Sequence, residues 1–442
     1  MRFLNVKFGV DALIPVLTWL RHSSPAVAHV SSTSSEALQR LHSTADGLAA
    51  DEAAQRWRMT GPNQPRAGKL ICLKGASISR ATIDKRQMWP RIDPRKPQMN
   101  NTMSLSAWEL DEQRFDASAA LEQQLRFALQ YAVLAPSNHN TQPWRFIVDD
   151  DTVQVCADRM RALPVVDPFD RELLISCGAA LFNLRVALSH FGLAYAITLF
   201  PSESDPDIVA HVRVSRDGHR DAELADLFSA MTARVTTRAP FADEPVAEAL
   251  QTKLAAACDA EGAIASCVDA RASRLAIAQL IAEADRIQFA DPRFRRELAS
   301  WIHPRRLGDG MPAYGTAVGG LLDLAAPPVT SVVRVFDVGA GAPATHERLV
   351  EGSPLLVGIA TTRDDREAWL AAGQALERVL LLATSEGLTA SYLNQPIEVT
   401  TLREPLGTLL KVDATPQLLL RVGCCGPQVN HAPRRPLSDV VD

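Results

Sequence analysis

The sequence is poor in the residues that build metal centres and disulfide frameworks. Its 442 residues include seven cysteines, an odd number, and none of them forms a CxxC pair or a Cys/His group at metal-ligand spacing. This argues against a metal site and against a disulfide-bonded exported protein, and it favours a reducing cytoplasm. Cys424 and Cys425 are adjacent and could be redox-active, but their apolar context is more typical of the end of a strand.

The sequence also has little net charge and few long apolar runs. The net charge is only −5, and no dense Lys/Arg block with interleaved aromatic residues occurs in the later part of the chain, so nucleic acid is not an expected partner. We expect no segment long and apolar enough to span a membrane. The run 8–20 contains Asp11 and follows Arg2 and Lys7, so a secretory signal is the alternative interpretation of this stretch. A small molecule is the expected partner.

The first hundred residues differ from the rest. They become basic and proline-rich toward Asn101, and they predict a linker or a disordered segment without a stable fold. One stretch, 41–63, predicts a short helix that ends at Gly-Pro-Asn, and it resembles the N-terminal segment of P-type cation-transporting ATPases. We interpret 1–102 as a fused remnant or as upstream sequence, with Met103 as a natural start for the domain that follows.

The stretch 135–146, Ala-Pro-Ser-Asn-His-Asn-Thr-Gln-Pro-Trp-Arg-Phe, is the first candidate site. Its polar side chains stand on backbone that two prolines stiffen, so donors and acceptors are held in fixed places, as a planar heteroaromatic ligand requires. The alternative is an ordinary turn with a tryptophan packed beneath it. The candidate ligand-binding residues are Ser137, Asn138, Asn140 and Gln142.

A second candidate site lies a hundred residues later, at 231–241. Arg234 and Arg238 are four apart, with Thr236 between them. Two guanidinium groups and a hydroxyl suit a phosphate, because guanidinium forms charge-assisted bidentate hydrogen bonds with it. A solvated helix face is the other interpretation of this pattern.

From about residue 106 the pattern alternates between long helices and short strands. Apolar spacings of three and four predict helices at 122–134 and 170–190, the second with Gly192 just beyond its end. Strand-like runs follow a period of two or are continuously apolar, and they are expected at 146–148, 153–155, 194–200 and 208–214. The longer helix is expected to lie in the core.

The chain also resembles itself. A shift of 195 residues places 170–201 on 365–396 with nine identities in 32 positions and no gap, Gly178 on Gly373 among them. This indicates a duplicated unit, and a tandem repeat with one apolar helix in each copy predicts a single chain that imitates a symmetric dimer. The 135–146 motif occurs only in the first copy, because the corresponding part of the second, near 255–262, lacks it.

These motifs together resemble the FMN-dependent nitroreductase family, and within it the duplicated, single-chain Acg-type members. The resemblance covers about 106–442. It rests on the pattern PS..N.QPW.F at 136–146, on R.T.R at 234–238, on GQAL.RVLL.AT..GL.AS.LNQP.E at 373–398 and on RRPL.DV at 434–440.

The resemblance implies an α+β nitroreductase-like fold in two tandem repeats, 106–225 and 226–442, that form a pseudo-dimer. It implies one FMN between them, and the implied binding residues are Ser137, Asn138, Asn140, Gln142, Arg234, Thr236, Arg238, Leu393, Asn394, Gln395, Arg434 and Arg435. Arginines would face the phosphate, and backbone groups of 393–395 the flavin N5 edge. His139 is expected to position or pack, and no metal or catalytic side chain is expected.

The implied activity is two-electron transfer from NAD(P)H, through flavin N5, to a nitroaromatic or quinone, in a cytoplasmic monomer. The long, punctuated stretch 303–345 is expected to act as a lid. If the lid is closed, nicotinamide cannot stack on the flavin, and the alternative function is a protein that stores or sequesters FMN. A transporter fragment is a third reading, which rests on 41–63 alone.

Overall fold

The computed structural model describes residues 106–218, 221–237, 239, 241–302, 308–311, 350–425 and 431–442. The helix expected within 41–63, the region before Met103, Arg238 and most of the expected lid 303–345 lie outside this part of the chain. Residues 308–311 are the part of the expected lid that the structure describes.

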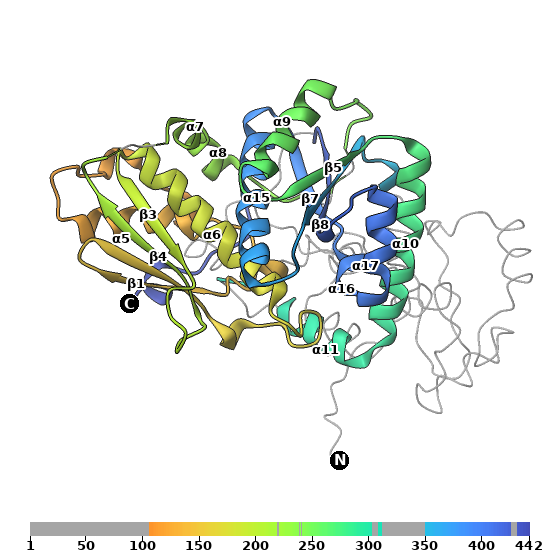
Figure 1. Cartoon of the computed structure of the whole chain (residues 1–442), viewed down its shortest axis with the longest axis horizontal. Helices are drawn as coiled ribbons and strands as arrows, with labels where there is room; N and C mark the ends of the chain where they lie inside the picture. The colour runs from red at the N-terminus through yellow and green to blue at the C-terminus, as the bar shows by residue number, and fades with distance from the viewer. Residues whose placement is uncertain are drawn as a thin grey trace, which may run out of the picture. The chain divides into compact units, whose positions relative to one another are not determined.

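The strands of the described residues form two four-stranded antiparallel sheets (Figure 1). Sheet 1 has the order β1-β2-β4-β3 and sheet 2 the order β5-β6-β8-β7. The strands are β1 Trp144–Asp149, β2 Thr152–Ala157, β3 Ala194–Leu199, β4 Ile208–Ser215, β5 Ile264–Val268, β6 Leu355–Thr361, β7 Thr389–Tyr392 and β8 Thr415–Gly423. Each sheet has one register shift, between its two central strands. The two sheets therefore have the same strand order, and their register shifts lie at the same position in that order.

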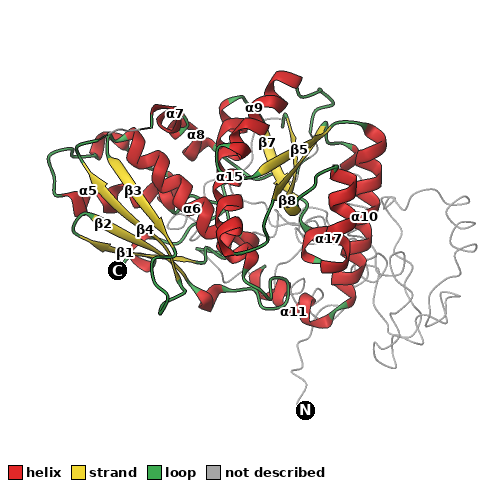
Figure 2. Ribbon diagram, in the orientation of Figure 1, coloured by secondary structure: helices red, strands yellow, loops and turns green. Residues whose placement is uncertain are grey.

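Two long helices, α6 and α15, lie between the sheets (Figure 2). The α-helices are α5 Leu121–Ala132, α6 Arg171–His190, α7 Ala222–Asp226, α8 Phe228–Ala233, α9 Glu248–Asp259, α10 Arg271–Ala290, α11 Pro292–Trp301, α15 Arg366–Ser385, α16 Gln395–Glu398 and α17 Thr400–Leu410. The short 3-10 helices are Ser106–Trp108, Glu112–Arg114, Asn138–Asn140, Arg159–Arg161 and Leu437–Asp439. The helices and strands expected between 122 and 214 are confirmed within a few residues at each end.

Helix α6 corrects one expectation from the sequence. Among the described residues it is the helix long and apolar enough to cross a membrane, although no such segment was expected. In the structure 89% of its most apolar stretch is buried inside the protein. It is surrounded by α5, α15 and sheet 1, so its apolar surface is explained by packing in the core.

One glycine on each helix sets the crossing of α6 and α15. A Cβ atom added to Gly178 would lie 2.2 Å from the carbonyl oxygen of Leu370, and one added to Gly373 would lie 2.0 Å from that of Ile175. Any side chain there would force the helices apart, so glycine is required for this close approach. The two contacts are reciprocal, because Leu370 and Gly373 stand 195 positions after Ile175 and Gly178.

The two sheets differ in how many faces they bury. Along β1 buried and exposed side chains alternate over the first four residues, whereas every residue of β6 is buried. The sequences match this in part: Leu-Leu-Val-Gly-Ile-Ala is continuously apolar, whereas Trp-Arg-Phe places a charged residue between two buried aromatic ones. Ile147, the fourth residue of β1, is an apolar side chain that is 37% exposed. Helices α10, α16 and α17 pack against the second face of sheet 2.

The C-terminal segment 431–442 leaves the second half of the chain and joins sheet 1. The backbone N–H of Phe146 donates to the oxygen of Val440 at 2.7 Å, and that of Asp442 donates to Phe146 at 2.9 Å. Upstream in the same segment, the His431 ring stacks on Trp108 with centroids 4.0 Å apart, and Trp108 Nε1 donates to the oxygen of Ala432 at 2.9 Å. The segment thus crosses from one half to the edge of the other half's sheet.

Candidate functional site

The loop that joins α5 to β1, residues 133–143, has an unusual backbone. His139, Asn140 and Gln142 have φ angles of 49°, 53° and 51°, in the left-handed region that residues other than glycine rarely adopt. Each such residue costs about 1–2 kcal/mol. The corresponding connection between α9 and β5 spans only 260–263, so the second half has no counterpart of this loop, as expected.

Two amide side chains hold the strained loop in place. Asn140 Nδ2 donates to the oxygens of Gly310 and Pro433, both at 3.0 Å. Gln142 Nε2 donates to the oxygen of Gly308 at 2.9 Å, and Gln142 Oε1 accepts from the backbone N–H of Arg435 at 2.8 Å. Asn140 is 8% exposed and Gln142 is fully buried. Both amides therefore point into the protein and bind its backbone. The sequence had instead predicted that they would be presented to a ligand.

The described residues of the expected lid are fastened to this loop. Besides the two amide contacts, the backbone N–H of Gly310 donates to the oxygen of Asn140 at 3.1 Å. Asp309 forms an ion pair with Arg161, and the Arg161 guanidinium also donates to the oxygen of Thr141. Residues 308–310 consequently cover the inner side of the loop.

Asn140→Ala should destabilise the protein by about 2–3 kcal/mol. The change removes two donated hydrogen bonds and leaves the Arg434 Nη1 donor, 3.0 Å from Asn140 Oδ1, without that acceptor. It also places alanine at a left-handed position that asparagine tolerates better. Urea unfolding measures the loss. Met160→Ala is the control, because a side chain that is 93% exposed should change stability by less than about 0.5 kcal/mol.

Two arginines from the second half meet behind the loop, around one buried carboxylate. Arg234 Nε lies 3.3 Å from Oε1 of Glu377, a fully buried residue of α15. Arg234 Nη2 and Arg434 Nη2 both donate to the oxygen of Leu134, at 2.8 and 3.0 Å. The Arg434 guanidinium also lies 4.9 Å from the Trp108 ring. The sequence-predicted Arg234 and Arg434 are thus brought together with the loop of the first half.

Burial shapes the protonation of this cluster. Burial raises the pKa of Glu377 to about 7, although Arg234 and Arg434 oppose the rise. Burial, and then the charge of Arg234, lower the pKa of Arg434 to about 9. The same causes lower the pKa of His431 to about 4, so this ring is neutral at pH 7. Two guanidinium groups therefore face a carboxyl group that is only partly ionised near neutrality.

The cluster also holds donors that are not satisfied. Among the described residues, Arg434 Nε and the Tyr392 hydroxyl are buried and make no hydrogen bond. Together with the excess of positive charge, these groups fit the phosphate and polar edge of an anionic ligand. The residues present are therefore compatible with a phosphate-bearing cofactor such as FMN.

The other predicted site residues occupy different places. Thr236 is exposed, and its backbone bridges Ala390 of β7 in parallel. Leu393 is buried in the core behind sheet 2, and Asn394 Oδ1 accepts from the backbone N–H of Leu419 at 3.0 Å. Gln395 is the first residue of α16. Ser137 Oγ accepts from the backbone N–H of Gln142 at 2.8 Å, inside the loop.

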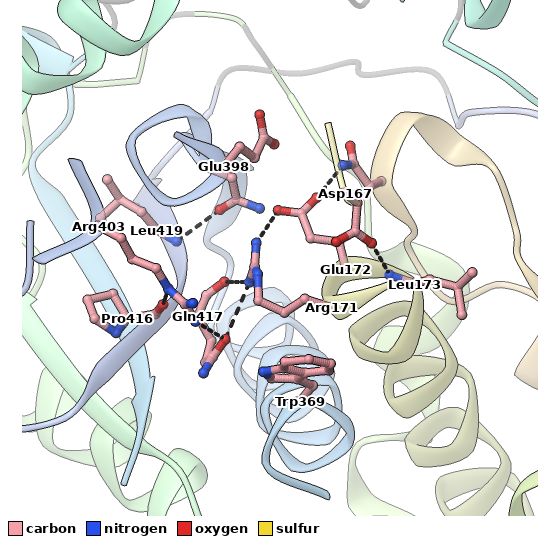
Figure 3. A network of polar contacts seen from close by, with 12 residues as sticks. Asp167, Arg171, Glu172, Leu173, Trp369, Glu398, Arg403, Pro416, Gln417 and Leu419 are labelled. Atoms are coloured by element: carbon pink, nitrogen blue, oxygen red, sulfur yellow. Dashed lines mark hydrogen bonds and ion pairs between the residues drawn. The ribbon is translucent and has the colours of Figure 1, made fainter. Parts of the chain in front are cut away.

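Several polar side chains lie near one another between the first turn of α6 and α16 (Figure 3). The Asn138 amide donates to Glu172 in the first turn of α6, and Arg171 Nη2 donates to the other Glu172 oxygen at 2.6 Å. Glu398, the last residue of α16, lies near this pair and accepts from Gln288 Nε2 at 2.5 Å. Asn138 of the first half therefore reaches a buried acid with its side chain, as Arg234 of the second half does.

Sequence reasoning missed Glu172, Glu377, Glu398 and Tyr392. Glu172 belongs to the triplet Asp170-Arg171-Glu172, which recurs 195 positions later as Asp365-Arg366-Glu367, but this recurrence drew attention to duplication and not to the acid. Glu377 follows Gly373 by one helical turn, in a run whose apolar spacing drew attention to the core. An acid inside an apolar helix face was the signal that could have identified it.

The chain resembles several known proteins in sequence. No protein-family model matches. The chain is 32% identical over 326 residues to "Putative NAD(P)H nitroreductase acg" of Mycobacterium tuberculosis, which spans 72% of this chain and 94% of the relative. It is 26% identical over 318 residues to "Probable NAD(P)H nitroreductase PigM" of a Serratia species, covering 68% and 88%. The chain belongs to the nitroreductase family.

Solved structures of nitroreductases resemble parts of the chain. One is a nitroreductase with bound FMN from Bacteroides fragilis, with a TM-score of 0.30, 15% identity, and coverage of 48% of this chain and 95% of that one. The resemblance of 41–63 to P-type ATPases receives no support from the relatives, which are named as nitroreductases or are uncharacterised.

Proposed function

We propose that the protein binds one FMN and transfers two electrons from NAD(P)H to a nitroaromatic or quinone acceptor. One observation carries the proposal: the 133–143 loop and two arginines of the second half, Arg234 and Arg434, converge on a buried site with unneutralised positive charge. The names of the relatives, which describe NAD(P)H nitroreductases, support the same assignment.

The phosphate would be held by arginines. Arg234 and Arg434 supply buried positive charge, Arg435 stands beside the loop, and Arg238 and Thr236 complete the predicted set. Ser137, Asn138, Asn140 and Gln142 would shape the ring-binding side, the last two by holding the backbone of the loop. Residues 393–395 would present backbone groups to the ring edge. Bound FMN would supply the hydride-accepting centre, and these residues would orient it.

We further propose that 106–225 and 226–442 are tandem nitroreductase-like repeats, which act as a pseudo-dimer in a monomeric chain. The shared strand order, the shared register shift and the reciprocal contacts of Gly178 and Gly373 support this. Since only the first repeat has the long loop, one chain would hold one flavin where a symmetric dimer would hold two.

A second candidate function is storage or sequestration of FMN without turnover. The fastening of 308–310 to the loop, through Asn140, Gln142 and the Arg161–Asp309 ion pair, favours it. A cover held by several buried contacts would prevent nicotinamide from stacking on a bound ring.

The purified protein should be yellow, with the absorption spectrum of oxidised flavin and one FMN per chain. Addition of NADPH or NADH alone should then bleach the flavin. Subsequent addition of nitrofurazone or menadione should restore the yellow colour and allow continuous oxidation of the nicotinamide. A yellow protein that neither bleaches nor oxidises the nicotinamide supports storage and excludes the oxidoreductase. A colourless protein that takes up no FMN would contradict both functions, provided that circular dichroism shows it to be folded.

A further inference from the structure

The carboxylate of Glu172, in the first turn of α6, contacts the 133–143 loop. It is 3% exposed, it accepts from the Asn138 amide through one oxygen and it accepts from Arg171 through the other, at 2.6 Å. The contact between Arg171 and Glu172 is drawn as a dashed line in Figure 3. The orientation of a predicted flavin-binding side chain thus depends on one buried carboxyl group.

Acids outnumber the available cations around Glu172. Asp167 precedes α6 and is 6% exposed, and Glu398 approaches from α16. Arg171 faces all three acids, while Arg403 of α17 is engaged by Asp364 at 2.8 and 2.9 Å. Three acids that share one arginine favour the retention of a proton.

The pKa values of Glu172 and Glu398 are raised, as expected where buried acids outnumber cations. Burial, and then the charge of Glu398, raise the pKa of Glu172 well above its usual range, while Arg171 opposes the rise. Burial raises the pKa of Glu398 to about 7. Both acids therefore hold a proton at higher pH than an exposed glutamate does.

We propose that Glu172 is a positioning residue, whose protonation decides which end of the Asn138 amide faces the flavin site. An ionised carboxylate only accepts, so it takes the amide NH₂ and turns Oδ1 away as an acceptor for the ligand. A protonated Glu172 donates its O–H to Oδ1, and the amide turns over and offers its NH₂ instead. This inference rests on the proposed FMN site, because that site contains Asn138.

The test is FMN affinity as a function of pH, measured by flavin fluorescence with the full-length protein and three variants. When the amide turns over, it offers the ligand a hydrogen-bond donor in place of an acceptor. The Kd for FMN should therefore change about 3–10-fold between about pH 5 and pH 9. The FMN phosphate itself titrates near pH 6, so the quantity compared is the ratio of the wild-type Kd to the Glu172→Gln Kd at each pH. A glutamine can donate or accept but does not titrate, so this ratio should vary with pH.

Two other variants separate positioning from folding. Glu398→Gln keeps Glu172 buried but removes the charge that adds to the effect of burial on its pKa, so the pH dependence should persist with its midpoint at lower pH. Asn138→Ala should remove the pH-dependent part while Glu172 still titrates. Circular dichroism and urea unfolding confirm that each variant is folded.

The outcomes are distinct. A ratio that varies with pH, a lower midpoint for Glu398→Gln and no variation for Asn138→Ala would support the inference. Tight FMN binding with a ratio that does not vary with pH, or an Asn138→Ala variant that keeps the wild-type profile, would overturn it and leave the FMN proposal intact. No FMN binding by folded wild-type protein would overturn both.

Discussion

Arg234→Met should destabilise the protein by about 3–5 kcal/mol at pH 8, and by clearly less at pH 5.5. The substitution leaves the fully buried Glu377 without the guanidinium that lies 3.3 Å away, and it removes a hydrogen bond to Leu134. A buried acid that loses its counter-charge is costly only when it is ionised. Urea unfolding at the two pH values measures the difference.

The pH dependence follows from the folded-state pKa of Glu377. This pKa, about 7, lies above the ordinary value of 4.5, so the folded state binds the extra proton between these two values. The contribution of Glu377 to stability is therefore fully present below pH 4.5 and is lost as the pH rises through 7. Removal of Arg234 takes away a charge that lowers this pKa, so the loss should extend to higher pH in the variant.

The double variant Arg234→Met with Glu377→Gln is the control for this prediction. With no ionisable group at 377, much of the loss at pH 8 should be recovered, and the pH dependence should become weaker. An equal loss for Arg234→Met at both pH values, or a double variant that is less stable than the single one at pH 8, would show that the ion pair is not the cause.

Gly178→Ala and Gly373→Ala should each destabilise the protein by about 3 kcal/mol or more. The new methyl group would lie 2.2 Å or 2.0 Å from a backbone oxygen of the other helix, and backbone cannot move away as the end of a side chain can. The α6 and α15 helices must separate along a contact that joins both halves of the core. Thermal and urea unfolding followed by circular dichroism would measure the effect.

Gly407→Ala is a matched control, because Gly407 also lies within a helix, α17. Its nearest neighbour to an added Cβ is Pro416 at 3.5 Å, an ordinary contact. Alanine should stabilise the helix there by up to about 1 kcal/mol. The double variant Gly178→Ala with Gly373→Ala should cost less than the sum of the single changes, since one separation of the helices relieves both clashes. Simple additivity would argue against a shared crossing point.

Local patterns in the sequence were sufficient to predict the helices and strands of the core. The spacing of Leu173, Cys177, Leu181, Leu184 and Leu188 depends only on the helical period, and it predicted α6 correctly. The repeated Gly178 and Gly373 were visible as an alignment, but their contact across the crossing depends on the packing of two helices. Periodicity identifies a buried face and does not identify its partner.

The candidate site was predictable only in part, because its contacts join residues far apart in the chain. The partner of Arg234 is Glu377, and the partners of Asn140 lie at Gly310 and Pro433. A sequence shows that an amide can donate, but the direction in which Asn140 donates depends on left-handed backbone angles that the residue type permits and does not dictate. For this reason Asn140 and Gln142 were expected to face a ligand and were found to hold the loop.

The pairing of the C-terminal segment with Phe146 also bears on solubility. Strand β1 is at an edge of sheet 1, where unpaired N–H and C=O groups would otherwise offer a template for a strand from another molecule. The segment 440–442 occupies part of that edge through hydrogen bonds to Phe146 and Val148. If it detached, the molecule would lose part of its contact between halves and would also expose a surface suited to edge-to-edge aggregation.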